Sequence, residues 1–513
     1  MCPAHRGRGR HRHRGCDATR PHRPGDPARW RRAVTTDGID HRSSVFAGEV
    51  LTAREFQYPR VAGVVSALRG LTVLVDELPA PAGSLVSIRS RMAATPRGRV
   101  GDGIPGEVIG FTRDHAVVMT LADTAGIRPG DQVVCEQVAP SASVGDAMIG
   151  RCVDGLSRPI DGRGPIHGLV PRPMTPPPIS PMSRRRIRDA LHTGVRAIDL
   201  FTTLGCGQRM GIFAGPGVGK STLLGTIASR SDADVNVIAL IGERGREVRD
   251  FIEHSLGEAG LDRSVLFVAT GDESPLMRVR AAKAACTQAE HFRSRGKRVL
   301  LVMDSITRFA HAQRQIGLAV GEPPATRGYT PSVFAQLALL LERAGAVDPG
   351  ADGSWDDPAP GGGGGSITGL YTILVEGDDM TEPVADAARG ILDGHVILSR
   401  SLAHKAHYPA IDVLDSVSRV ADEVCSPEHA EARRRVVRLL AMFKDVEDLV
   451  QIGAYARGSR PETDVAIDLH DEIVRLLRQG REESTPFDRG LADLRRLSEK
   501  SAQMLSRAAP TRR

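Results

Sequence analysis

The sequence predicts an α/β nucleotide-binding core with a small β-barrel domain before it and a helical domain after it. Three observations carry this prediction. Apolar strand-like runs alternate with helical patterns over residues 193–425, a phosphate-binding loop lies within that stretch, and short β-type runs precede it. A chain of 513 residues has room for roughly three domains at about 100–200 residues each.

Residues 1–45 form an arginine-rich tail that we expect to be disordered. Residues 1–32 hold ten arginines and no lysine against Asp17 and Asp26, which gives 10 − 2 = +8, so the other 481 residues sum to 6 − 8 = −2. The tail has neither a hydrophobic period nor the apolar segment of a signal peptide. Its charge suits contact with an anionic surface, and it could equally be an upstream extension read from an early start codon. The near-neutral remainder does not indicate nucleic-acid binding.

The apolar runs and the cysteines bear on location. No apolar run approaches the roughly 18–20 residues of a membrane span. The seven cysteines are scattered and form neither a C-x-x-C pair nor a cluster with histidine, so neither a zinc site nor a disulfide framework is indicated. We therefore expect a reduced, cytoplasmic protein.

Residues 46–140 are predicted to form the β-barrel domain. Short β-type runs separated by glycine and proline lie at residues 61–66, 71–75, 85–88, 107–111 and 116–120. A barrel of this size could bind oligonucleotides, but the aromatic residues that stack on bases are scarce, at 4% of the chain. A structural collar is the favoured role.

Residues 141–192 are predicted to be a proline-rich linker, because six prolines lie between Pro171 and Pro181 and proline donates no strand hydrogen bond. In the core, residues 193–425, the apolar runs rich in Val, Ile and Leu are typical of parallel strands buried on both faces. Residues 345–365 break this pattern with acidic residues and five consecutive glycines, which indicates a surface loop. Residues 426–513 have helical spacing throughout. The predicted core strands are residues 209–214, 235–241, 265–269, 299–303 and 371–375.

The central motif is the glycine-rich segment GPGVGKS, which begins at Gly215 and ends at Ser221 with the G-K-S of a phosphate-binding loop. An apolar run leads into it and a helix-forming run follows, which is the context that a phosphate-binding loop needs. Glycines let backbone N–H groups wrap a phosphate, and the next helix presents its positive end to the same anion. Lys220 is expected to reach the β- and γ-phosphates and Ser221 to hold Mg²⁺, so ATP and Mg²⁺ are the predicted cofactors. The predicted nucleotide-binding residues here are Gly215, Pro216, Gly217, Val218, Gly219, Lys220, Ser221 and Thr222.

Two acidic residues end neighbouring apolar runs. Glu243 follows the run at 235–241, where a carboxylate could orient a water for attack, although an ordinary helix-capping glutamate fits equally well. Asp304 ends the run at 299–303, in the pattern of a Walker B aspartate that holds Mg²⁺.

From about residue 46 to residue 479 the chain resembles the type III secretion ATPases, relatives of the rotary ATP synthase catalytic subunit that drive flagellar and injectisome protein export. The motifs that carry the resemblance are GERGREVRDFIE at 242–253, DSITRFA at 304–310, GEPPATRGYTPSVF at 321–334 and ILDGH at 391–395. The resemblance implies a RecA-like ATPase core between the barrel and the helical domain, in a ring of six identical subunits with the sites at their interfaces.

The resemblance also implies roles for single residues. Glu243 becomes the catalytic base, and Arg244 a neighbour of the γ-phosphate. Tyr408 matches the aromatic residue that packs on adenine, although from its own context it would be a core ring before a proline. Arg419 matches the arginine finger that reaches into the adjacent subunit's site, which can supply roughly 10³–10⁵ in rate.

The expected partners are a stator-like regulator, a central stalk protein, export substrates with their chaperones, and the membrane export gate, with no nucleic acid. The expected location is cytoplasmic, at the inner face of the cytoplasmic membrane. Flagellar export is favoured over an injectisome. Further alternatives are a rotary ATP synthase-like catalytic subunit, an RNA-translocating ring helicase and a non-catalytic ring subunit. The tail, the loop at 345–365 and Pro216 depart from the family pattern.

Overall fold

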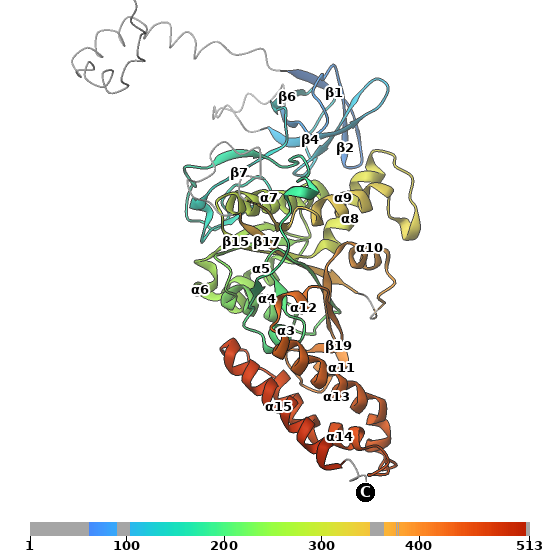
Figure 1. The fold of residues 1–513 in the computed structure, drawn as a ribbon. Helices are drawn as coiled ribbons and strands as arrows, with labels where there is room; N and C mark the ends of the chain where they lie inside the picture. The colour runs from blue at the N-terminus through green and yellow to red at the C-terminus, as the bar shows by residue number, and fades with distance from the viewer. Residues whose placement is uncertain (1–60, 90–102, 349–363, 376, 378, 509–513) are drawn as a thin grey trace, which may run out of the picture. The chain divides into compact units, whose positions relative to one another are not determined.

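The computed structural model of the chain describes residues 61–89, 103–348, 364–375, 377 and 379–508 (Figure 1). The predictions for the arginine-rich tail, for the barrel domain up to residue 60 and for most of the loop at 345–365 lie outside those residues. None of the described helices is long and apolar enough to cross a membrane.

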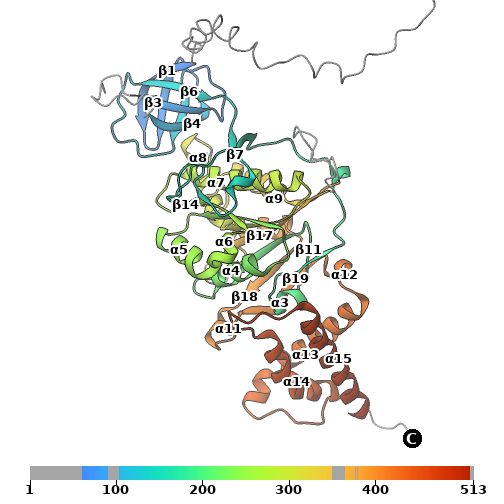
Figure 2. The ribbon, with the colours of Figure 1, turned by 90° about the vertical axis from the view of Figure 1, so that its left-hand side faces the viewer.

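The first described domain is a closed barrel, as the sequence predicts (Figure 2). Its strands follow the order β1-β2-β5-β4-β3-β6, and valines at alternate positions, such as Val73, Val75 and Val118, fill its interior. The closing strand β6 was not among the runs named from the sequence, since it offers only Val133 and Val134 between polar residues. The barrel strands are β1 (Ala62–Arg69), β2 (Thr72–Asp76), β3 (Leu85–Arg89), β4 (Ile104–Phe111), β5 (Ala116–Thr120) and β6 (Gln132–Gln137).

The segment predicted to be a linker contains strands. β7 (Ser141–Val144) pairs with β9 (Val170–Pro173), and β8 (Cys152–Val153) joins the edge of the central sheet beside β14. Proline fits in β9 because this strand belongs to a two-stranded ribbon, where an outward-facing position needs no N–H donor. The segment also holds the short helices η3 (Asp146–Met148) and η4 (Pro181–Ser183), and β10 (Ala190–Leu191), which pairs with β11 (Leu204–Gly205).

The core is a nine-stranded sheet in the order β19-β18-β12-β17-β15-β13-β14-β8, with β16 paired to β17. Neighbours from β18 to β8 run parallel, as the apolar runs predict, and each predicted core strand is present. The strands are β12 (Arg209–Ala214), β13 (Val235–Ile241), β14 (Ser264–Ala269), β15 (Arg298–Asp304), β16 (Gly345–Ala346), β17 (Ser366–Leu374), β18 (Gly394–Leu398) and β19 (Ile411–Ser418).

Helices cover both faces of this sheet (Figure 1). Alternate residues of each strand enter different cores: Val237 and Ala239 pack with α7 to α10, whereas Ile238 and Leu240 pack with α3 and α4. The helices are α3 (Arg196–Phe201), α4 (Lys220–Arg230), α5 (Gly245–Asp250), η5 (Phe251–Leu256), α6 (Gly257–Leu261), α7 (Pro275–Ser294), α8 (Ile306–Ala319), η6 (Thr326–Gly328), α9 (Pro331–Leu341), α10 (Pro383–Ile391), α11 (Arg400–His404) and α12 (Ala421–Val424).

The C-terminal domain is helical, as predicted. Ser426 caps its first helix by accepting the His429 N–H at 3.2 Å. Val436, Leu469 and Leu494, one from each helix, are buried in the same core as α3, so this domain packs directly on the ATPase core. Its helices are α13 (Pro427–Gln451), α14 (Pro461–Leu477) and α15 (Phe487–Ala508).

Strands β18 and β19 were not predicted from the sequence, and they decide where Arg419 lies. β18 runs parallel to β12, with His395 opposite Gly211, and β19 returns antiparallel, with Ser418 opposite Gly394. The end of β19 therefore lies level with the start of β12, at the end of the sheet opposite to the phosphate loop.

Candidate functional site

The phosphate loop joins the end of β12 to the start of α4. Gly217 and Gly219 have φ angles of 78° and 88°, a left-handed conformation that favours glycine, and Gly219 is the N-cap of α4. Leu223, Leu224 and Ile227 anchor the helix in the core. The N–H groups at the N-terminus of α4 are thus fixed at the edge of the sheet, as anion binding requires.

Lys220 contacts one further residue predicted for catalysis and one predicted for metal binding. Its ammonium contacts a carboxylate oxygen of Asp304, at the end of β15, and lies 3.4 Å from Oε1 of Glu243, which follows β13. Asp304 is only 2% exposed, and a lone buried carboxylate would be costly, so this pairing is needed.

Thr372 belongs to the same cluster and was not found from the sequence. It lies on β17, which runs between β12 and β15, and its hydroxyl donates to Oδ1 of Asp304 at 2.7 Å. The strand was predicted, but a threonine inside a buried strand carries no motif that would single it out.

Glu243 does not cap the helix that follows it. Helix α5 begins at Gly245 with Arg244 as its N-cap and no side-chain cap. The pKa of Glu243 is raised to about 6, because burial, helped by the nearby Asp304, raises it more than Lys220 lowers it. A carboxylate with a pKa near 6 is deprotonated at pH 7 and remains a competent base.

Two arginines lie near this cluster. Arg244 is 86% exposed and pairs with Glu247 at 3.1 Å, so the structure does not bring it onto Lys220 or Asp304. Arg308, which was not predicted, lies in the first turn of α8, and its side chain packs so closely on Gly242 that a Cβ there would lie 2.8 Å from Arg308 Cβ. The sequence alone could have indicated Arg308, because it lies one helical turn after Asp304.

Tyr408 lines a pocket of about 540 Å³ beside the phosphate loop. Its ring carbon Cε1 lies 3.7 Å from the position of a Cβ on Gly219, and 47% of the residue is exposed. The ring is therefore not a core residue and is open to a ligand's apolar face. The pocket is lined by Val195, Gly217, Val218, Gly219, Thr222, Leu223, Thr226, Leu398, Tyr408, Pro409, Ala410, Gln479, Gly480 and Arg481.

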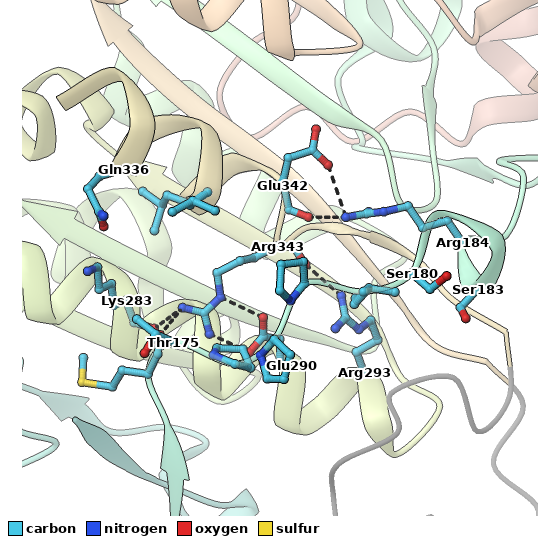
Figure 3. A pocket seen from close by; sticks show the side chains of 17 residues that line it. Thr175, Ser180, Ser183, Arg184, Lys283, Glu290, Arg293, Gln336, Glu342 and Arg343 are labelled. Atoms are coloured by element: carbon cyan, nitrogen blue, oxygen red, sulfur yellow. Dashed lines mark hydrogen bonds and ion pairs between the residues drawn. The ribbon is translucent and has the colours of Figure 1, made fainter. Parts of the chain in front are cut away.

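A second pocket, of about 410 Å³, lies between the proline-rich segment and helices α7 and α9 (Figure 3). None of the predicted site residues lines it. Its charged side chains include two ion pairs, Arg343 with Glu290 at 2.6 Å and Arg184 with Glu342 at 3.2 Å. It is not the nucleotide site.

Arg419 and Lys220 lie at opposite ends of the strands of the central sheet. Arg419 directly follows β19, whereas the phosphate loop follows β12, and the six residues of β12 span roughly 20 Å between the two ends. Arg419 is exposed, and within the described residues its guanidinium contacts only the backbone carbonyl of Arg389, at 3.4 Å. The Arg419 side chain therefore cannot reach the phosphate loop of its own chain.

The oxygen groups predicted to bind Mg²⁺ suit that ion. Ser221 offers a hydroxyl in the first turn of α4, and Asp304 offers a carboxylate. Magnesium typically binds one or two carboxylates plus phosphates and water, so a full protein cage is not needed. In the described part of the chain no group of three or more His, Cys, Asp or Glu could hold a metal by itself.

Three protein-family descriptions match the chain. Residues 65–136 match the beta-barrel domain of the ATP synthase alpha/beta family, and residues 194–418 match the nucleotide-binding domain of that family. Residues 425–496 match the C-terminal domain of the type III secretion ATPase EscN. The three matches follow the three structural domains in order.

Two curated relatives and one solved structure are similar over most of the chain. The flagellum-specific ATP synthase of Treponema pallidum is 48% identical over 445 residues, 87% of this chain and 95% of the relative. The type 3 secretion system ATPase of Xanthomonas euvesicatoria is 49% identical over 385 residues, 75% of this chain and 84% of the relative. The assembled EscN ATPase of enteropathogenic E. coli, solved with its central stalk EscO, superposes with a TM-score of 0.75 at 38% identity, covering 85% of this chain and 100% of EscN.

Proposed function

The chain belongs to the ATP synthase alpha/beta family, in its type III secretion branch, and we propose that it hydrolyses ATP to drive type III protein export in the flagellar system. The observation that carries this proposal is the cluster of Lys220, Glu243 and Asp304 where three parallel strands end. A phosphate-loop lysine with two carboxylates at that edge supplies the groups that phosphoryl transfer to water needs.

In the proposed reaction, the N–H groups of residues 215–222 cradle the ATP phosphates. Lys220 moves its charge from Asp304 to the β- and γ-phosphates. Ser221 and Asp304 are the residues that would hold Mg²⁺, whose charge neutralises the phosphate oxygens when it is bound. Glu243 accepts the proton of the attacking water.

Tyr408 and Arg244 complete the proposed nucleotide contacts. Tyr408 lies beside the phosphate loop with an exposed ring face, which suits packing against adenine. Arg244 adjoins Glu243 and is exposed, so its guanidinium can turn from Glu247 towards the γ-phosphate.

We propose that Arg419 completes the site of an adjacent subunit. Its place at the far edge of the sheet separates it from its own phosphate loop, and its guanidinium has no carboxylate partner in the described residues. A homohexameric ring, in line with the assembled form of EscN, gives each site one Arg419 from a neighbour. A charge delivered in this way stabilises the transferring phosphoryl group.

The finer assignments rest on the family. EscN was solved with a central stalk protein, which supports a stalk partner for this ring. A stator-like regulator, export substrates with their chaperones and the membrane export gate are proposed as further partners. We place the ring in the cytoplasm, at the inner face of the cytoplasmic membrane.

An injectisome is the second candidate system, because the Xanthomonas relative of that type is as similar as the flagellar one, at 49% against 48% identity. The longer match to the Treponema protein, 445 against 385 residues, favours the flagellum. Cells that lack this chain should lose flagellar filaments. Cells that keep filaments but stop secreting effector proteins would move the assignment to the injectisome.

The enzymatic part is tested by Glu243→Gln. The variant should still bind ATP and should lose about 10²–10⁴ in kcat, because the amide cannot accept the proton. Glu253→Gln is the matched control: it changes an exposed glutamate that pairs with Arg249 on the same segment, and it should keep normal turnover. Normal turnover in Glu243→Gln would refute the assigned base.

A further inference from the structure

Arg419 is held by the last residues of α10 and the two residues that lead from α10 to β18. The Asp393 carbonyl accepts the Arg419 N–H at 3.0 Å, and the Arg389 carbonyl accepts from Arg419 Nη2 at 3.4 Å. Residues 389–393, which we call the finger support, therefore contact Arg419 at both its backbone and its guanidinium.

The finger support is fixed by Arg209, the first residue of β12. Asp393 Oδ2 accepts the Arg209 N–H at 3.1 Å and Nε–H at 3.0 Å, while Oδ1 accepts from Nη2 at 3.2 Å. In return, the Asp393 N–H donates to the Arg209 carbonyl at 2.8 Å. A two-pronged guanidinium–carboxylate pair sets orientation as well as distance, which a single contact does not.

We propose that Asp393 and Arg209 are positioning residues for Arg419, and so for catalysis in the neighbouring subunit; this inference rests on the proposed role of Arg419 in trans. Their pairing sets the direction of the Asp393 peptide, whose carbonyl holds the Arg419 backbone. A rate that depends on a delivered charge is sensitive to placement, since an error of about 1 Å can cost about 10²-fold.

Two further features restrain the same region. Gln208 donates from Nε2 to both the Asp393 carbonyl and the Ser418 hydroxyl, each at 3.1 Å, and so ties the support to the residue before Arg419. At Gly394 a Cβ would lie 2.4 Å from the Val417 carbonyl oxygen, so β18 and β19 approach more closely here than any side chain allows.

The Arg209–Asp393 pair is braced from the domain surface by Glu342, which follows α9. Its carboxylate contacts Arg209 and also Arg184, the latter at 3.2 Å (Figure 3). Arg184 follows the proline-rich segment and donates to the carbonyls of Glu342 and Ala344 at 2.6 and 3.0 Å. The charge chain Arg184–Glu342–Arg209–Asp393 thus connects that segment to the finger support.

This arrangement gives β12 two duties. Its last residue, Ala214, leads into the phosphate loop of the chain's own site, and its first residue, Arg209, holds the support of the arginine meant for another site. One strand of six residues links the two halves that each subunit contributes to the ring.

The test is Asp393→Asn, with Asp234→Asn as the matched control. Asp234, which directly precedes β13, makes the corresponding pair with Arg298, the first residue of β15: it accepts the Arg298 N–H at 2.7 Å and lies 3.8 Å from the Arg298 guanidinium, but it does not contact Arg419. Asp393→Asn should lower kcat by about 10- to 100-fold with KM for ATP unchanged, whereas Asp234→Asn should stay within about two-fold of the wild type. Arg209→Lys keeps the positive charge but cannot donate to both oxygens of Asp393 at once, so its kcat should lie between those of Asp393→Asn and the wild type.

Mixed rings separate positioning from general damage. Asp393→Asn has an intact phosphate loop, so mixing it with Lys220→Ala subunits, which carry an intact Arg419, should restore activity. No recovery in rings shown to be mixed, or equal losses in Asp393→Asn and Asp234→Asn, would overturn the inference.

Arg419→Ala, measured in parallel, separates the proposed role of Arg419 from the positioning role of Asp393 and Arg209. Full activity in Arg419→Ala would remove the proposed role of Arg419 itself. Loss of activity in Arg419→Ala together with full activity in Asp393→Asn would overturn the positioning role alone.

Discussion

The two ends of β12 hold their charges in different ways. Where the strand ends, Lys220 contacts Asp304 and Glu243, and all three charges are satisfied within one chain. Where the strand begins, the Asp393 carbonyl accepts from the backbone N–H of Arg419, and among the described residues its exposed guanidinium contacts only a carbonyl oxygen. The charges at the phosphate-loop end are paired with one another, whereas the charge of Arg419 has no carboxylate partner among the described residues.

This difference follows from burial. A buried charge must be paired inside its own chain, because an unpaired one costs several kcal/mol or more. An exposed arginine has no such requirement, so its backbone can be fixed while its charge stays available. In the function that we propose, the phosphate-loop end is the receiving half-site and the Arg419 end is the donating one.

The strongest way to break this comparison is Arg419→Ala. Removing the donated charge should lower kcat by about 10³-fold or more and leave ATP affinity unchanged, because the receiving half-site is untouched. Steady-state hydrolysis and binding of a fluorescent ATP analogue measure the two quantities. Arg496→Ala, an exposed arginine on α15, is the control and should change neither. A parallel loss of ATP binding would mean that Arg419 supports its own site.

Tyr408 sharpens the comparison at the receiving end. Tyr408→Ala should raise KM for ATP by about 10-fold with little change in kcat, because stacking on a base is worth about 1–3 kcal/mol. Tyr408→Phe keeps the ring and should behave like the wild type. The ratio of KM for ATP to KM for triphosphate alone reports the adenine contact, and an unchanged ratio in the alanine variant would contradict it.

The smallest expected effect is that of Thr372→Val. The hydroxyl donates a hydrogen bond to Asp304, so its loss should lower kcat by about three- to ten-fold. This is somewhat less than the full effect of losing one hydrogen bond to a charged group, because Lys220 still contacts Asp304. Thr372→Ser retains the donor and should recover most of the activity. A thermal melt checks that the valine variant remains folded, and equal activity of valine and serine variants would argue against this role.

How much the sequence predicts depends on how local each signal is. The phosphate loop and Asp304 each lie where an apolar strand meets a loop, so local patterns single them out. The pattern around Glu243 fitted a helix-capping role equally well, and only the family resemblance favoured a catalytic one. The core strands are continuous apolar runs and are predicted for the same reason. Strands β18 and β19 alternate buried and half-exposed residues, a weaker pattern that was missed.

The remaining site residues are defined by contacts between distant segments. Asp393 and Arg209 are 184 positions apart, and Thr372 and Asp304 are 68 apart. Neither pair stands out until the sheet order places β12 beside β18 and β17 beside β15. The proline-rich segment shows the reverse case, since its local signal indicated a linker although short strands tie it to the core.

The central claim is that each site takes its arginine from a neighbour, and mixing two inactive variants tests it most directly. Arg419→Ala keeps the receiving half-site, and Lys220→Ala keeps the donating one. In rings assembled at random from equal amounts, roughly one quarter of the interfaces join two intact halves, so activity should return to about that fraction of the wild type. Rings shown by mass measurement to contain both variants, yet without activity, would contradict the account.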